Sequence, residues 1–330
     1  MKTTVRNALL GVTSAGLAAG LVTAPVQAAK WDMPLAYSAS NYHSKNAAKF
    51  AEMVKKNSGG KINIVTHPGG SLFKGGEIFR AVRTGQAPIG ERLISALGNE
   101  SPLFEIDALP FLATSYADAL KLHKAALPVL NKILAKKRVK LLYAVPWPPQ
   151  GLYNKKPVKT IADMKGMKFR AYNAATARLA TLMGAIPTKI EAAEISQAFA
   201  TGVAQSMISS GSTGYDRKIW EHVKYWYDTQ AWLPKNMVII NIKVWDGLDA
   251  AGKAALTKAA ADAQKTGWAE SQRLANWYKT ELKKKGMIVE KPSAALASQF
   301  RKLGDTMMSE WLKRAGDEGK AVIAAYKAMK

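Results

Sequence analysis

Two successive runs of alternating strand and helix patterns constrain the fold of this chain more than any other feature. In the first run, residues 31–37 and 61–65 have strand patterns, and apolar residues at helical spacing lie between them. The second run begins with an apolar strand at 139–145 and continues with a strand at 167–170 and a helix at 174–183. Strands that alternate with helices predict an α/β fold with a largely parallel sheet and helices on its faces.

A proline-rich segment at 145–151 joins the two α/β units, and this organisation predicts two lobes with a cleft between them. A mature length of about 300 residues also exceeds what a single core usually serves. The β-prone run 238–242 would carry the chain back to the first lobe. The proline-free segment 249–285 predicts one long helix that braces both lobes, and a last helix is predicted at 294–314.

These patterns place the boundaries of the lobes. We expect residues 29–150 and 241–275 to form lobe I, and residues 151–240 and 276–330 to form lobe II. The ligand of such a protein would lie in the cleft between them.

Residues 1–28 have the pattern of an export signal rather than of folded structure. Lys2 and Arg6 form a positive end, residues 8–22 carry no charge, and residues 26–28 place small side chains where a signal peptidase cleaves. The uncharged run is shorter than the roughly 20 apolar residues of a membrane span. We therefore expect cleavage after Ala28 and a soluble mature protein in the periplasm.

The chain is strongly basic, with a formal net charge of +24, and this charge raises the question of nucleic acid binding. Its lysines are spread along the chain, however, and their longest run is only 283–285. No zinc-finger spacing or RNP motif is present, and export removes most nucleic acid partners. A spread positive field favours anionic small molecules or a membrane partner instead.

Motifs for catalysis, cofactors and metals are missing from the sequence. The four histidines lie far apart, no Gly-x-Ser-x-Gly elbow occurs, and the absence of cysteine excludes thiolate metal sites. Residues 247–254 have P-loop spacing, but Ala254 stands where the magnesium ligand should be, so Asp249 is predicted to cap a helix. The loop 209–212 is expected to be flexible. We predict a binding protein with no cofactor or metal, not an enzyme.

Arg170 ends a short predicted strand where the chain turns into a helix. A guanidinium keeps its proton in proteins, and burying it without a partner costs several kcal/mol. Its side chain is therefore solvated, paired within the protein, or available to an anion that comes from outside.

Two tryptophans are candidate walls of a binding pocket. Trp147 lies in the proline-rich segment, and Trp232 lies in a loop just before the returning strand. Both lie in loops between strands, where α/β proteins place ligands. The alternative is a core position, which we prefer for Trp226 and Tyr227.

Five segments together resemble the DctP family, the extracytoplasmic solute-binding proteins of TRAP transporters. They are Asn-Tyr-His at 41–43, Gly-Gly-Lys-Ile at 59–62, Gly-Gly-Ser-Leu-Phe at 69–73, Leu-Pro-Phe-Leu at 109–112 and Ile-Ala-Asp-Met-Lys-Gly-Met-Lys-Phe-Arg at 161–170. The last segment is the most specific, because Asp-Met-Lys-Gly-Met-Lys-Phe-Arg at 163–170 matches a signature of the family, with the arginine at the end of a strand. The likeness covers essentially the whole mature chain.

This resemblance implies a two-lobed, Venus-flytrap-like fold that encloses an organic acid and then docks on a permease driven by an ion gradient. It implies that Arg170 forms a bidentate pair with the ligand carboxylate. Family members that bind sialic acid carry a second arginine twenty residues earlier, where this chain has Gln150, and place an asparagine near Gln230. The resemblance therefore implies that Gln150 and Gln230 also lie at the ligand. We therefore expect a monocarboxylate with an apolar or aromatic body between Trp147 and Trp232, and no second arginine beside Arg170.

Four further polar residues are predicted to reach the ligand. Asn41 and His43 would offer hydrogen bonds from lobe I, with a helix cap and a solvated ring as the alternative. Asn173 and Asn236 could bind the same ligand, although Asn173 could also cap a helix. Two other classes of protein stay open, the binding component of an ABC-type importer and an exported hydrolase.

Overall fold

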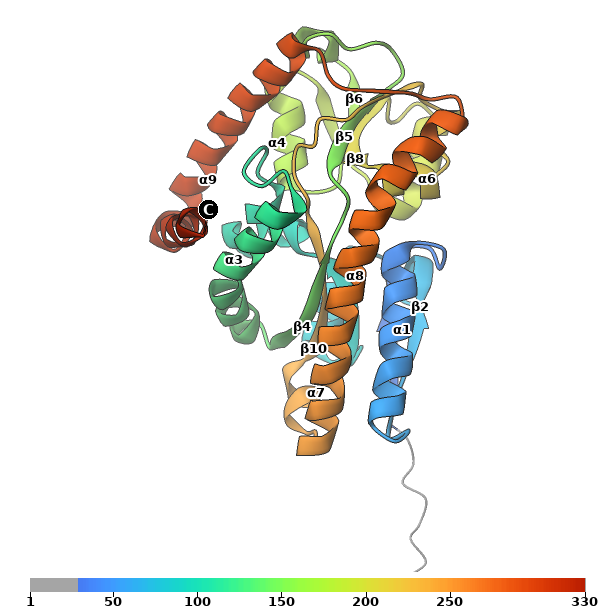
Figure 1. Cartoon of the computed structure of the whole chain (residues 1–330), viewed down its shortest axis with the longest axis vertical. Helices are drawn as coiled ribbons and strands as arrows, with labels where there is room; N and C mark the ends of the chain where they lie inside the picture. Colours follow the sequence, from blue (N-terminus) through green and yellow to red (C-terminus); the bar gives the residue numbers. More distant parts are fainter. Residues whose placement is uncertain (1–28, 330) are drawn as a thin grey trace, which may run out of the picture.

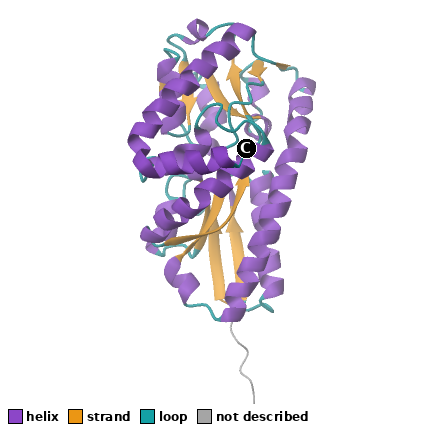
Figure 2. Ribbon diagram, turned by 60° about the vertical axis from the view of Figure 1, so that its left-hand side comes forward, coloured by secondary structure: helices purple, strands orange, loops and turns teal. Residues whose placement is uncertain are grey.

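The computed structural model describes residues 29–329, which form two α/β lobes, as the sequence predicts (Figures 1 and 2). The predicted signal segment, 1–28, lies outside the described residues. None of the helices between residues 29 and 329 is both long and apolar enough to cross a membrane.

Lobe I contains a parallel pair of strands, β1 and β2, and a three-stranded sheet in the order β3-β10-β4. Its strands are β1 (Ala29–Pro34), β2 (Ile62–His67), β3 (Ile89–Leu93), β4 (Val139–Pro146) and β10 (Lys235–Asn241). Its helices are α1 (Tyr42–Asn57), α2 (Ile78–Thr84), α3 (Tyr116–Lys136) and α7 (Ile242–Asp246). The prediction of a largely parallel sheet is wrong here, since β10 returns from lobe II and runs antiparallel to both neighbours.

Lobe II is built on a mixed sheet of six strands in the order β11-β9-β5-β8-β6-β7. These strands are β5 (Gln150–Asn154), β6 (Lys168–Ala171), β7 (Ile186–Lys189), β8 (Ser206–Ser210), β9 (Tyr225–Tyr227) and β11 (Ile288–Glu290). Its helices are α4 (Ala174–Leu182), α5 (Ile195–Ala200) and α6 (Gly211–Asp216). Trp226 and Tyr227 are buried core residues, as expected.

Two chain segments cross between the lobes side by side. The first leads from β4 into β5, and the second leads from β9 into β10. The Trp147 amide donates to the Pro234 carbonyl at 2.7 Å, and the Gln150 amide donates to the Trp232 carbonyl at 3.0 Å. The floor of the cleft is therefore a pair of hydrogen-bonded crossing segments.

The predicted long helix is α8 (Ala250–Lys284), which runs along both lobes (Figure 1). It begins where expected, because the Asp249 carboxylate accepts a hydrogen bond from the Gly252 amide at 2.6 Å. The helix packs on α1 and β4 of lobe I and on α6 of lobe II. At Gly267 an added Cβ would lie 2.5 Å from a methyl of Val145, so glycine permits the close approach to β4.

The last helix, α9 (Ala294–Ala328), is longer than predicted. It continues through a kink at Gly316, whose φ of 60° a glycine adopts without strain. Its first part packs on α4, while Trp311 donates to the Pro102 carbonyl at 2.7 Å and Tyr326 donates to the Leu112 carbonyl at 3.0 Å. The end of α9 thus lies on lobe I, whereas the sequence-based boundaries placed all of 276–330 in lobe II.

Candidate functional site

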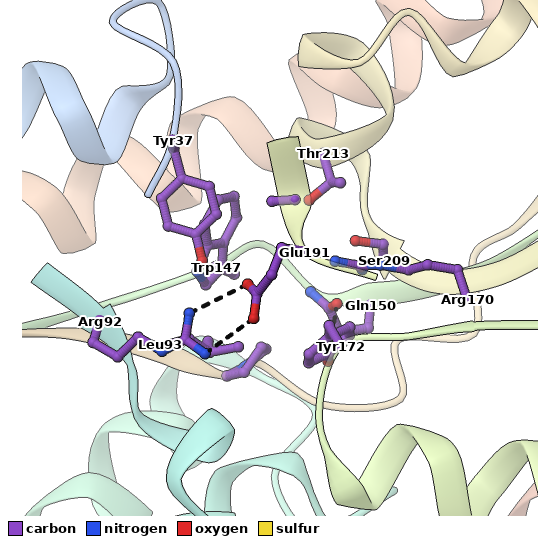
Figure 3. Close-up of a pocket in the computed structure, with 12 residues that line it drawn as sticks. Tyr37, Arg92, Leu93, Trp147, Gln150, Arg170, Tyr172, Glu191, Ser209 and Thr213 are labelled. Atoms are coloured by element: carbon purple, nitrogen blue, oxygen red, sulfur yellow. Dashed lines mark hydrogen bonds and ion pairs between the residues drawn. The ribbon is translucent and has the colours of Figure 1, made fainter. Parts of the chain in front are cut away.

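A pocket lies between the lobes above the crossing segments (Figure 3). Both lobes contribute to its wall, and most of its polar side chains come from the ends of strands. The lining residues are Tyr37, Arg92, Leu93, Trp147, Gln150, Arg170, Tyr172, Glu191, Ala192, Ser209, Thr213 and Pro234. Of the residues predicted from the sequence, Trp147, Gln150 and Arg170 line this pocket.

Arg170 projects from β6, which lies between β7 and β8. Its side chain is almost fully buried, and its Nε donates to the Ile190 carbonyl at 2.9 Å. The guanidinium carbon lies 5.1 Å from the centre of the Tyr172 ring. Burial lowers the pKa of Arg170 to about 10, so the group stays charged at neutral pH. Among residues 29–329 no carboxylate pairs with it, which leaves its charge available to an anion.

A second arginine, Arg92 on β3, faces the same pocket from lobe I, which corrects the prediction that Arg170 has no arginine beside it. Arg92 is as buried as Arg170. Its two terminal nitrogens each lie 3.4 Å from one carboxylate oxygen of Glu191, which belongs to lobe II. In the sequence we looked for a second arginine at position 150, twenty residues before Arg170. Arg92 was missed because it belongs to the other lobe and lies far from Arg170 in the sequence.

Trp147 is held in the pocket wall by a chain of hydrogen bonds. Its Nε1 donates to Asn236 Oδ1 at 2.8 Å, and Asn236 Nδ2 donates to Glu91 Oε1 at 2.6 Å. The indole packs against the rings of Tyr37 and His43, with ring centres 4.7 and 4.3 Å away. Burial raises the pKa of Glu91 to about 7. Asn236 therefore lies behind the wall and positions the indole.

Trp232 and His43 also lie behind the wall, although we expected both at the ligand. Trp232 is fully buried, and its Nε1 donates to the Tyr172 hydroxyl at 3.0 Å. That hydroxyl in turn lies 3.4 Å from Gln150 Oε1. His43 is buried rather than solvated, and burial lowers its pKa well below the usual value. These two rings support Tyr172 and Trp147 from outside the pocket.

Asn41 and Asn173 cap helices, which was the alternative interpretation of each. Asn41 accepts from the His43 amide at 2.8 Å, and Asn173 accepts from the Thr176 amide at 2.8 Å. Both side chains also connect the lobes. Asn173 Nδ2 donates to Ser95 Oγ at 2.9 Å, and Asn41 Nδ2 donates to Asp216 Oδ2 at 2.5 Å.

Gln230 lies away from the pocket. Its side chain is exposed and lies 3.4 Å from Asp228, and its φ of 47° belongs to the left-handed region. The turn at this position directs the amide to solvent, which explains the difference from the sequence-based expectation.

Sequence reasoning missed several lining residues for two physical reasons. Ser209 is the next-to-last residue of β8, and residues 209–212 are buried where this strand leads into α6, so the prediction of a flexible loop there is wrong. Tyr172 follows Arg170 by two residues, and the alternation of a strand could have placed both on one face. Tyr37 and Glu191 come from loops that carry no local motif. No group of residues between 29 and 329 has the composition and geometry of a metal site.

The sequence model of the DctP family, described as bacterial extracellular solute-binding protein, family 7, matches residues 35–314. The chain belongs to this family. The C4-dicarboxylate-binding periplasmic protein DctP of Rhodobacter capsulatus is 27% identical to it over 301 residues, 86% of each chain. Membership in this extracellular family implies an exported protein.

Two solved structures are more similar to this DctP-family chain. A TRAP solute-binding protein of an unidentified marine microbe, specific for pyroglutamate and containing that molecule, is 53% identical, with a TM-score of 0.91 over 92% of this chain and 100% of that one. A pyroglutamic acid-binding extracytoplasmic solute receptor of Bordetella pertussis is 49% identical, with a TM-score of 0.90 over 91% of this chain and 100% of that one. The chain is thus a solute-binding protein of the TRAP type, and these relatives are receptors rather than enzymes.

Proposed function

We propose that this DctP-family protein is the periplasmic receptor of a TRAP transporter and captures a small monocarboxylate, with pyroglutamate as the first candidate. Two relatives that are 53% and 49% identical are described as binding pyroglutamate. The observation that carries the proposal in this chain is the buried guanidinium of Arg170, which has no carboxylate partner among the described residues. A ligand carboxylate would supply that partner through a bidentate pair.

The charges around the pocket favour one ligand carboxylate rather than two. The charged side chains that line it are Arg92, Arg170 and Glu191. Since Glu191 already pairs with Arg92, one positive charge is in excess. This balance supports a monoanion over the dicarboxylates bound by more distant relatives.

The remaining walls suit a small polar ring such as a lactam. Trp147 and Tyr172 offer flat apolar surfaces, while Gln150, Ser209 and Thr213 bring an amide and two hydroxyls to the pocket (Figure 3). A few polar groups on an apolar wall fix the orientation of a ligand and select its functional groups. This arrangement replaces the predicted sandwich between Trp147 and Trp232.

The protein would deliver the ligand to a permease after the protein has been exported and its lobes have closed on the ligand. In this proposal the signal is cleaved after Ala28, the ligand is enclosed in the periplasm, and the closed protein docks on the membrane permease of a TRAP system. No feature of the site favours an ABC-type importer or a hydrolase.

Calorimetric titration of the mature protein would test this function. We expect stoichiometric binding of L-pyroglutamate, and no binding of 2-pyrrolidinone, which keeps the lactam ring and lacks the carboxylate. Succinate and N-acetylneuraminate serve as the dicarboxylate and the sugar acid. Binding of succinate alone would refute the monocarboxylate assignment, and turnover of a bound ligand would refute the receptor.

A further inference from the structure

We infer that Glu191 sets the number of carboxylates that the pocket accepts, because it pairs with the guanidinium of Arg92. This inference rests on the proposed function and names the residue that gives the site its selectivity against dicarboxylates. Without Glu191, the pocket would present two unpaired arginines, one on each side of the ligand.

The geometry of the pair supports this role. Glu191 places one oxygen near each terminal nitrogen of Arg92, both at 3.4 Å, as a ligand carboxylate would do (Figure 3). The Nε of Arg92 is buried and has no hydrogen-bond partner among residues 29–329, so Glu191 is the acceptor found for this guanidinium. An added Cβ at Gly75 would lie 3.0 Å from Glu191 Oε2 and 3.1 Å from Arg92 Nη1, so the glycine leaves room for the pair.

The backbone that carries Glu191 is fixed from both sides. Its amide donates to Glu194 Oε2 at 3.2 Å, which begins the short 3₁₀ turn Ala192–Glu194. The preceding residue, Ile190, accepts from Arg170 Nε at 2.9 Å and donates its own amide to the Ala171 carbonyl at 3.0 Å. Arg170 therefore helps to hold Ile190 in place, and the next residue, Glu191, neutralises Arg92.

This arrangement penalises a second ligand carboxylate in two ways. A dianion held by Arg170 would bring its other carboxylate toward Glu191, and like charges at close range in a partly buried site repel each other. Displacing Glu191 from Arg92 would instead leave a protein carboxylate without its partner. A monocarboxylate held by Arg170 leaves the pair of Glu191 with Arg92 in place and brings only one negative charge near Glu191, which also attracts Arg170.

The test is Glu191→Gln, which keeps the size of the side chain and an acceptor oxygen but removes the charge. Calorimetry at neutral pH with L-pyroglutamate, succinate and glutarate would compare this variant with the wild type. We expect the affinity for at least one dicarboxylate, relative to that for pyroglutamate, to rise by about tenfold or more. Glu221→Gln is the matched control, because it removes the same charge at an exposed position of lobe II outside the pocket lining, and it should leave this ratio unchanged.

The double variant Arg92→Gln/Glu191→Gln distinguishes an effect of the pocket's charge from an effect of the room inside the pocket. It removes the pair and restores one excess positive charge, so it should not gain dicarboxylate binding. If Glu191→Gln leaves the ratio unchanged while the wild type binds pyroglutamate, the inference is wrong and the proposed function stands. An equal gain in the double variant would also overturn it, since space would then be the cause. A wild type that binds succinate as tightly as pyroglutamate would refute both.

Discussion

The two walls of the cleft each carry one buried arginine, yet the two arginines have opposite surroundings. Arg92 projects from β3 of lobe I and reaches a carboxylate that lobe II supplies. Arg170 projects from β6 of lobe II, and its contacts are a backbone carbonyl and the face of Tyr172. Both side chains are 4% exposed, so burial does not distinguish them.

This comparison shows that the partner of a buried charge, rather than its burial, indicates where a ligand binds. A paired guanidinium is already satisfied and contributes shape and charge balance to the wall. An unpaired buried guanidinium destabilises the free protein, because it has lost water and gained no anionic partner. A ligand carboxylate that supplies this partner therefore binds more tightly.

The largest effect is expected for Arg170→Gln. Loss of the charged bidentate pair should lower the affinity for pyroglutamate by at least about 100-fold, or about 2.7 kcal/mol. The melting temperature of the free protein should change little, because removal of a buried charge without a carboxylate partner offsets the loss of the Nε hydrogen bond to the Ile190 carbonyl. Calorimetry and thermal unfolding would measure the two quantities.

Arg178→Gln provides the control for Arg170→Gln. Arg178 forms an exposed bidentate pair with Glu310 outside the pocket, at 2.9 and 2.6 Å, so its loss should not change ligand affinity. If Arg170→Gln bound pyroglutamate with nearly wild-type affinity, Arg170 would not be the ligand-binding arginine, and the distinction drawn between Arg92 and Arg170 would be wrong.

The next effect concerns Glu91, which lies behind the lobe I wall and next to Arg92 in sequence. Because burial raises its pKa to about 7, the folded protein holds this proton more tightly than the unfolded chain. The resulting stability is present at low pH and is lost as pH rises through 7. Between pH 5 and pH 8 the wild type should lose about 2 kcal/mol of unfolding free energy relative to Glu91→Gln.

Urea unfolding at several pH values would measure this difference. Glu52→Gln, the same substitution at an exposed position of α1, should run parallel to the wild type. A Glu91→Gln profile that is also parallel to the wild type would show that Glu91 titrates as an ordinary carboxylate.

A smaller effect is expected for Arg92→Gln. The variant leaves Glu191 unpaired and reduces the excess positive charge of the pocket to zero, so pyroglutamate affinity should fall by about tenfold, or about 1.4 kcal/mol. A loss as large as that of Arg170→Gln would mean that Arg92 also binds the ligand directly, and the two walls would then be equivalent. Calorimetry on both variants in one buffer decides between these outcomes.

The smallest effect is expected for Ser95→Ala, which removes the buried hydrogen bond from Asn173 between the lobes. Since this bond forms only when the lobes meet, its loss should weaken ligand binding by about 1 kcal/mol, or about fivefold. Ser40→Ala at an exposed position provides the control. Unchanged affinity in Ser95→Ala would show that this contact does not contribute to closure.

Local sequence patterns were sufficient for features that depend on neighbouring residues. The helix that begins after Asp249, the strand that returns as β10 and the position of Arg170 at the end of β6 follow from periodicity, capping and a short motif. The helix-capping alternatives for Asn41 and Asn173 have the same origin, because a cap is a contact within a few residues.

The sequence by itself therefore determined the α/β rhythm, the two-lobed arrangement and the arginine that we propose for the ligand. Only the tertiary structure decided that Arg92 meets Glu191, although 99 residues separate them. It also decided that Trp232 supports Tyr172 from behind rather than lining the pocket. The physical reason is that a strand or a cap is a local interaction, whereas the charge balance of the pocket exists only where two lobes close on each other.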